Sequence, residues 1–173
     1  ASAPELIDLK GEDAKTLEMY GVNRPDANIK ASRGGGPGQY KSFATNCLLA
    51  RRLVERGVRF VSIMHASRDH HSNLNDELSY NAGMADQPIA ALIKDLKQRG
   101  MLDDTMIVWG SEFGRTPLGE NRGGNPNATG RDHHPFAFTM LAAGGGIKGG
   151  QVYGETDEIG WSITKDPVDL HDF

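Results

Sequence analysis

A short apolar run that breaks abruptly into a polar segment limits the folds open to this sequence. Met106–Trp109 is rich in large and β-branched side chains, which favour a strand, and Gly110 ends the run. The polar segment that follows carries Glu112 and the triplet Asp132–His134. Carboxylate and imidazole groups are side chains that bind divalent metals. The pattern therefore predicts a buried strand that delivers a functional loop.

Two helices and a second strand precede this stretch. Apolar residues recur at three- and four-residue steps over 42–56, which predicts an amphipathic helix. The β-branched run 58–64 predicts a strand. The segment 73–99 is predicted to be helical, with Asp86 as the N-cap of its second half. A strand, a helix and a strand in this order form a right-handed crossover between parallel strands. The predicted fold class is therefore α/β, with a mostly parallel sheet flanked by helices.

The predicted sheet would bring separate polar loops to one edge. Loops that follow parallel strands leave the same edge, where open α/β sheets bind their ligands. Asp69 and His71 follow the first strand, and Glu112 follows the second. A third strand is expected at 136–142, and the Asp-His pair before it reaches this edge if that strand runs antiparallel or if the long loop crosses back over the edge. We expect it to be antiparallel.

The six histidines all follow Ser62, and Asp-His-His occurs twice, at 69–71 and 132–134. A lone histidine is more often structural, but two identical triplets at strand ends favour a metal site. Adjacent side chains on an extended segment point to opposite faces, which favours one histidine from each triplet. The predicted metal ligands are Asp69, His71, Glu112, Asp132 and His133. Groups expected beside the metal or on the substrate are His70, His134, Ser111 and His171. Without a thiolate, the set suits one or two Zn²⁺, Mn²⁺ or Fe ions.

Arg115 and Glu112 are the candidate catalytic residues. The planar guanidinium of Arg115 suits a phosphate or sulfate oxyanion, although an ordinary surface arginine in a turn is an equally good interpretation. A different function is suggested by Gly144–Gly149, which has the spacing G-x-G-x-x-G of dinucleotide-binding loops. No helical pattern follows it, so the helix N-terminus that would hold a phosphate is missing. We therefore discount dinucleotide binding.

Composition excludes several other classes. A length of 173 residues suits a single domain, of which 1–41 reads as a weakly structured lead-in with a short helix between Glu12 and Tyr20. The net charge of −4 disfavours nucleic acid as a partner, and no apolar run is long enough for a membrane span. The single cysteine, Cys47, excludes an intrachain disulfide and is expected to be buried.

Several motifs together resemble one protein family. The segments 111–117, 130–135 and 144–150 resemble the bacterial domain-of-unknown-function 1501 family, which is sulfatase-like and belongs to the alkaline phosphatase superfamily. The segment 68–73 resembles the Trp-Asp-Thr-His segment of that family and keeps Asp69 and His71. The resemblance spans roughly 42–173. It implies the C-terminal portion of a longer alkaline-phosphatase-like domain, with the nucleophile located upstream.

The resemblance implies a metal-dependent hydrolase of small-molecule or polymer-borne phosphate or sulfate esters. In such sites two cations clamp the attacking and leaving oxygens. Superfamily members carry an Asp-His pair where this chain has Glu112 and Phe113, so one metal position is weakened or lost. The alternative is a binding or scaffold module that keeps the fold but has lost the nucleophile and one metal position. Members of the family resemble exported proteins, which implies a periplasmic location.

Overall fold

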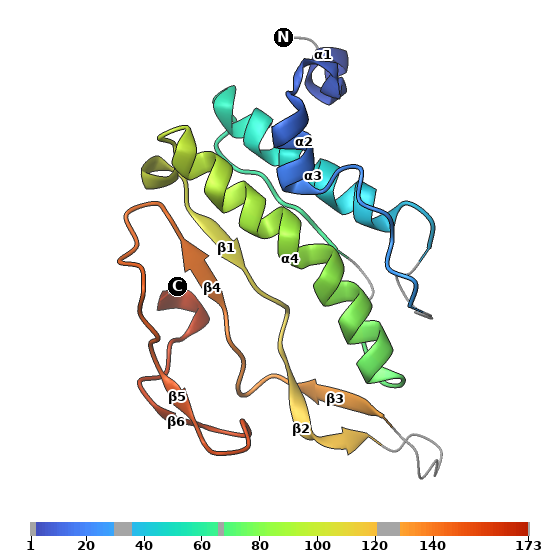
Figure 1. Cartoon of the computed structure of the whole chain (residues 1–173). Coiled ribbons are helices and arrows are strands. Elements are labelled where there is room, and N and C mark those ends of the chain that lie inside the picture. Colours follow the sequence, from blue (N-terminus) through green and yellow to red (C-terminus); the bar gives the residue numbers. More distant parts are fainter. Residues whose placement is uncertain (1–2, 30–35, 66–67, 121–128, 173) are drawn as a thin grey trace. The chain divides into compact units, whose positions relative to one another are not determined.

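The computed structural model of the chain describes residues 3–29, 36–65, 68–120 and 129–172 (Figure 1). These residues form two compact units. The first unit contains the chain up to Asp69 together with Asn75–Met101, and the second contains His70–Leu74 together with the chain from Leu102 onward.

The first unit is helical. Its elements are α1 (Ala3–Ile7), the 3-10 turn η1 (Leu9–Gly11), α2 (Ala14–Tyr20), α3 (Gln39–Glu55) and α4 (Leu74–Gln98), whose first residue belongs to the second unit. The expected short helix is α2. Asp13 caps it by accepting a hydrogen bond from the Thr16 amide at 2.9 Å, and Gly21 ends it in the left-handed conformation. None of the described helices is long and apolar enough to cross a membrane.

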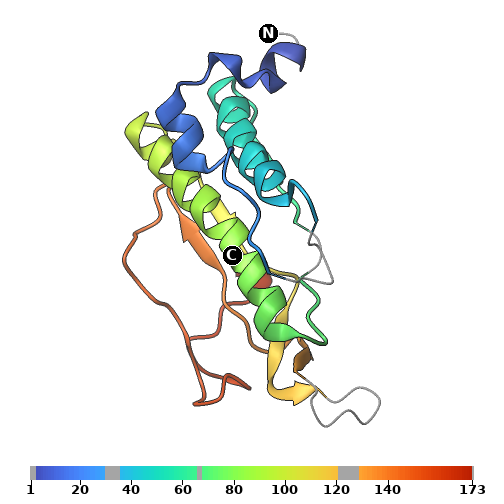
Figure 2. The ribbon, with the colours of Figure 1, turned by 45° about the vertical axis from the view of Figure 1, so that its right-hand side comes forward.

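The apolar faces of α2, α3 and α4 form the core of the first unit, and Figures 1 and 2 show these helices side by side. The fully buried side chains include Tyr20, Leu48, Met84 and Leu96. Burial of a leucine or methionine of this kind stabilises a fold by roughly 1.5–3 kcal/mol. Tyr40 links α3 to α4, because its hydroxyl donates to the Tyr80 carbonyl oxygen at 2.9 Å.

A buried ion cluster fixes the same helices in register. The Arg51 guanidinium donates to Asp95 at 2.9 Å, to Glu12 at 2.6 Å and to Glu55 at 2.6 Å. The Tyr20 hydroxyl also donates to Asp95, at 3.0 Å, and burial raises its pKa. A buried charge is tolerated only when it is paired in this way.

Helix α4 is continuous, and in this respect it differs from the prediction. Asp86 does not begin a new helix, because α4 runs from Leu74 to Gln98 with Pro88 inside it. A proline in a helix interior removes one backbone hydrogen bond and usually costs stability. Pro88 is itself fully buried, so the loss is offset by packing in the core.

The second unit consists of short paired strands. These are β1 (Ile107–Trp109), β2 (Gly114–Glu120), β3 (Gly130–His134), β4 (Leu141–Ala143), β5 (Glu155–Thr156) and β6 (Ile163–Lys165), with 3-10 turns η2 (Leu102–Asp104) and η4 (Leu170–Asp172). β1 pairs with β4, β2 with β3 and β5 with β6, and each pair is antiparallel.

The predicted α/β fold with a mostly parallel sheet is wrong. In the described part of the chain every sheet has two strands and none is parallel. The segment 58–64 is extended but joins no described sheet, and its Phe60 and Met64 are 85% and 88% exposed. A β-branched composition favours an extended backbone but does not supply a partner strand. The strand expected at 136–142 begins later, as β4, and is antiparallel to β1 as expected.

Candidate metal centre

The β2–β3 hairpin presents side chains from both strands at one site. Arg115 lies opposite His133, and Glu120 lies opposite Gly130. The register shifts between these two pairs, within a stretch that contains Pro117. Proline has no amide to donate to a ladder, and it occurs in sheets at edges and irregularities of this kind. This shift determines which side chains of β2 lie opposite the histidines of β3.

The segment His70–Leu74 runs against the start of β3 within the same unit. The Arg131 amide donates to the His70 carbonyl at 3.0 Å, and the Leu74 amide donates to the Thr129 carbonyl at 3.2 Å. Between these bonds Gly130 lies so close that a Cβ atom there would be 2.0 Å from the carbonyl carbon of His71. Only glycine permits this approach, and it places His71 beside β3.

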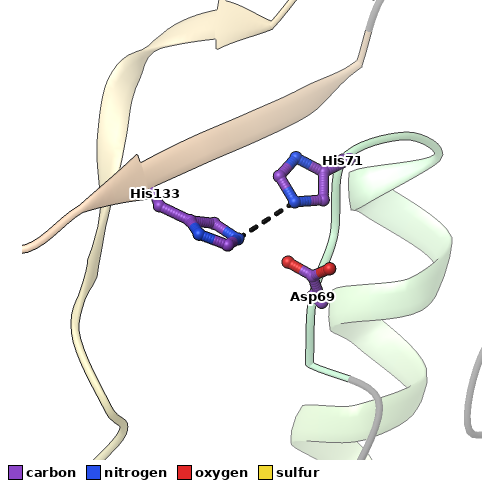
Figure 3. A group of neighbouring side chains, drawn as sticks. All are labelled: Asp69, His71 and His133. Atoms are coloured by element: carbon purple, nitrogen blue, oxygen red, sulfur yellow. Dashed lines mark hydrogen bonds between the residues drawn. The ribbon is translucent and has the colours of Figure 1, made fainter.

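His71 and His133 point their Nε2 atoms at each other, 3.1 Å apart (Figure 3). Two nitrogen ligands of a tetrahedral zinc ion, each about 2.0–2.1 Å from the metal, are separated by about 3.3 Å. The observed spacing is therefore close to that of two imidazoles on one ion. Without an ion, one of the two nitrogens must carry a proton for the contact to be favourable.

Glu120 determines which nitrogen of His71 is available. Its Oε2 lies 2.5 Å from His71 Nδ1, and the two side chains are only 9% and 7% exposed. A carboxylate accepts hydrogen bonds, so the proton of neutral His71 lies on Nδ1 and the Nε2 lone pair faces His133. Histidines that ligate metals are commonly oriented by a carboxylate in this way.

Carboxylates complete the set of donors. One ligand atom from each of His71, Glu120 and Asp132 lies within 4.8 Å of the others. Asp132 also accepts the His133 amide, at 2.7 Å, which fixes its carboxylate beside the strand. Asp69, drawn in Figure 3, is the last residue of the first unit before the chain enters the second. It lies two residues before His71 in the sequence.

An aromatic ring packs on His133, and a cation lies near that ring. The Phe113 ring packs on the His133 ring with centroids 4.4 Å apart. The Arg115 guanidinium lies 5.8 Å from the centre of the Phe113 ring and donates to the Arg131 carbonyl at 3.4 Å. Arg115 is the cross-strand partner of His133, so its charge belongs to the same hairpin as that imidazole.

Glu112, a predicted ligand, does not belong to the group of donors around His71 in the described residues. It is exposed and accepts a hydrogen bond from the Ser111 hydroxyl at 2.6 Å. That hydrogen bond is the main reason why the pKa of Glu112 is below its usual range, with a smaller contribution from the charge of Arg115. Glu112 and Ser111 therefore form an exposed pair of their own.

The other histidines have different surroundings. The buried His134 donates from Nε2 to the Trp161 carbonyl at 2.6 Å, and its ring stacks on the Trp161 ring at 4.7 Å. His70 is also buried, and His171 is exposed beside Asp169 at 2.6 Å. His65, which was not predicted as a site residue, contacts Asn81 in the first unit at 2.8 Å.

Glu120 is the site residue that sequence reasoning missed. It lies in a stretch with two glycines and a proline, which is typical of a loop, whereas the structure has strand β2 there. A β-hairpin predicted from the sequence would have been the signal that identified it. A strand ending at Glu120, paired with one beginning at Gly130, brings the glutamate toward the histidines.

The fold and the site together define a class: a two-unit protein of helices and short antiparallel hairpins with a histidine-carboxylate cluster in the hairpin unit. The chain belongs to the family described as "Protein of unknown function (DUF1501)", whose model matches residues 1–173. The match therefore includes the segment 1–41, which lies outside the motifs that suggested the resemblance. No curated protein and no solved structure matches the chain.

Proposed function

We propose that the chain binds a divalent transition-metal ion through Nε2 of His71 and Nε2 of His133, as part of a hydrolase of phosphate or sulfate esters. The observation that carries the metal proposal is the facing pair of nitrogens, 3.1 Å apart, with the opposite nitrogen of His71 held by Glu120. An ordinary pair of surface histidines needs no buried carboxylate behind it.

The remaining ligands would come from carboxylates. Asp132 is one candidate, because one of its oxygens lies within 4.8 Å of ligand atoms of His71 and Glu120. Asp69 is another, because it is two residues from His71 in the chain. A set of imidazole and carboxylate donors suits Zn²⁺, Mn²⁺ or Fe²⁺ and does not suit metals that select thiolates. One or two ions are compatible with this number of donors.

The chemistry proposed for the site follows from its charges. A bound divalent ion lowers the pKa of a coordinated water and polarises a phosphoryl or sulfuryl oxygen. Arg115 would hold the oxyanion, because its guanidinium is always charged and matches the planar arrangement of two ester oxygens. The nucleophile and the location outside the cytoplasm belong to the same proposal and rest on the family resemblance alone.

A binding or scaffold module without catalysis is the second candidate. The observation that favours it is the Phe113 ring, which covers one face of His133 at 4.4 Å. The phenylalanine ring has no donor atom for a metal, and it occupies one side of the imidazole where a second ion or a substrate would otherwise approach.

A substrate screen separates these two candidates. The chain is supplied with Zn²⁺, Mn²⁺ or Fe²⁺ and assayed with aryl phosphates, phosphodiesters and aryl sulfates. A hydrolase is expected to turn over one of these classes, to lose turnover in His133→Ala, and to lose about 100-fold in Arg115→Ala, the usual effect of removing one oxyanion donor. Lys165→Ala, an exposed change distant in sequence, serves as control. Metal binding without hydrolysis of any of the three substrate classes would reject the hydrolase and support the binding or scaffold module.

A further inference from the structure

The second unit has almost no hydrophobic core. Among the described residues, the buried hydrophobic side chains all belong to the first unit except Ala137. Large apolar side chains of the second unit are instead exposed. They include Met106, Val108, Trp109, Phe136, Phe138, Leu141, Val152, Tyr153 and Trp161. Burial of apolar surface is the dominant favourable contribution to folding, and this unit lacks most of it.

Hydrogen bonding in short hairpins does not replace a core. Among the residues of the second unit that the structure describes, each sheet has two strands, and the strands have between two and seven residues. An isolated two-stranded hairpin is marginally stable at best in water. Small domains that cannot bury enough apolar surface are usually stabilised by a disulfide or a metal. Cys47, the one cysteine, lies in α3 of the first unit, so a disulfide within the chain is excluded.

The metal site lies where a cross-link would have the largest effect on the second unit. It joins His71 to Glu120, 49 residues away, and to β3, which starts ten residues after Glu120. The buried residues of this unit that the structure describes include the proposed ligand His71 and two histidines next to proposed ligands in the sequence, His70 and His134. Bringing these segments together closes a long loop and costs conformational entropy, and the binding free energy of an ion would offset this cost.

We infer that binding of the metal ion is coupled to folding of the second unit, whereas the first unit folds without it. The inference rests on the proposed metal site. When an ion binds only the folded form, its binding free energy adds to the stability of that form. The first unit has its own apolar core and its own ion cluster, so its stability is independent of the metal.

The chain has separate spectroscopic probes for the two units. Both tryptophans, Trp109 and Trp161, belong to the second unit, and the Trp161 ring stacks on His134 next to the ligand His133. The α-helices belong to the first unit apart from Leu74, so ellipticity at the helical wavelength reports that unit. Tryptophan emission therefore follows one unit and circular dichroism follows the other.

The test is a urea titration of the full chain, after chelation and again with Zn²⁺ added, followed by both probes. Zinc is expected to shift the tryptophan midpoint to higher urea and to leave the circular dichroism midpoint in place. His133→Ala, which removes an exposed ligand and no core residue, should abolish the shift, and His171→Ala should retain it. Zinc content of the same samples is measured by elemental analysis.

The two proposals fail in different ways. If zinc binds to the wild-type chain but leaves the tryptophan midpoint unchanged, the coupling is contradicted and the proposed metal site is not. Both midpoints moving together also overturns the coupling, because the units would then fold as one. Absence of zinc from the wild-type chain overturns both the coupling and the proposed function.

Discussion

The chemistry of the candidate site depends on Glu120. A histidine alone can present either ring nitrogen, and only a partner on one nitrogen fixes which lone pair is available. Glu120 accepts a hydrogen bond from the Nδ1–H of His71 and thereby directs Nε2 to His133. The sequence motif points to a different residue, Glu112, whose carboxylate instead accepts from Ser111.

These two glutamates provide a matched pair of variants. Glu120→Gln keeps the shape of the side chain but removes the charge that orients His71, and loss of such a partner lowers metal affinity by about 10–100-fold. Glu112→Gln changes an exposed group outside the cluster and is expected to leave affinity unchanged. Competition against a chromophoric zinc chelator measures both. Equal losses in the two variants would favour the role predicted for Glu112 from sequence.

The histidines show what residue patterns can predict. Two Asp-His-His triplets indicate that imidazoles and carboxylates are concentrated at strand ends, and the structure brings His71 and His133 together. The patterns pointed to Glu112 and missed Glu120, which is the glutamate that approaches His71. That choice depends on the register shift in the β2–β3 hairpin, which no local sequence signal specifies.

At the scale of elements, the approach of β3 to the segment His70–Leu74 depends on Gly130. A methyl group there would meet the backbone of His71 at 2.0 Å, and backbone cannot move aside as a flexible side chain can. Gly130→Ala is expected to destabilise the second unit by about 1–3 kcal/mol, the usual cost of overpacking, and to weaken metal binding.

Gly149→Ala is the control for this change, since an added Cβ at Gly149 meets nothing within 4 Å. Urea unfolding followed by tryptophan emission measures the stability of both variants. If the Gly130 variant matched the wild-type chain in stability and zinc affinity, the close approach of β3 to His71 would be contradicted.

A separate prediction concerns Cys47, which lies in helix α3. This thiol is buried in the first unit, and burial raises its pKa to about 12. Because the thiolate is the reactive form, the native chain at pH 8 is expected to react with iodoacetamide far more slowly than the urea-unfolded chain. Mass spectrometry of the alkylated protein follows the reaction. Equal rates in the two states would show that Cys47 is accessible.

At the scale of the whole chain, the sequence predicted helices better than sheets. The repeat of apolar residues over 42–56 and the stripe through Leu92 and Leu96 both correspond to helices, because the apolar spacing of a helix is local. The parallel sheet was wrong because pairing is not local. A β-branched run such as 58–64 satisfies strand propensity without pairing with any strand in the described part of the chain, and β1 pairs with β4.

The two units also differ in what stabilises them. In the first unit, helices enclose apolar side chains and the paired charges of Arg51 and Asp95. In the second unit, the buried side chains that the structure describes include three histidines, His70, His71 and His134. The proposed ion would therefore have two roles in this chain, because it would take part in the chemistry of the site and stabilise the second unit.

X-ray absorption at the zinc edge of the zinc-loaded chain tests the central claim most directly. We predict a shell of nitrogen and oxygen ligands at about 2.0–2.1 Å, with the outer scattering of two imidazole rings, and loss of one ring in His133→Ala. A spectrum without imidazole scattering, or one unchanged by His133→Ala, would contradict the assignment of His71 and His133 as ligands.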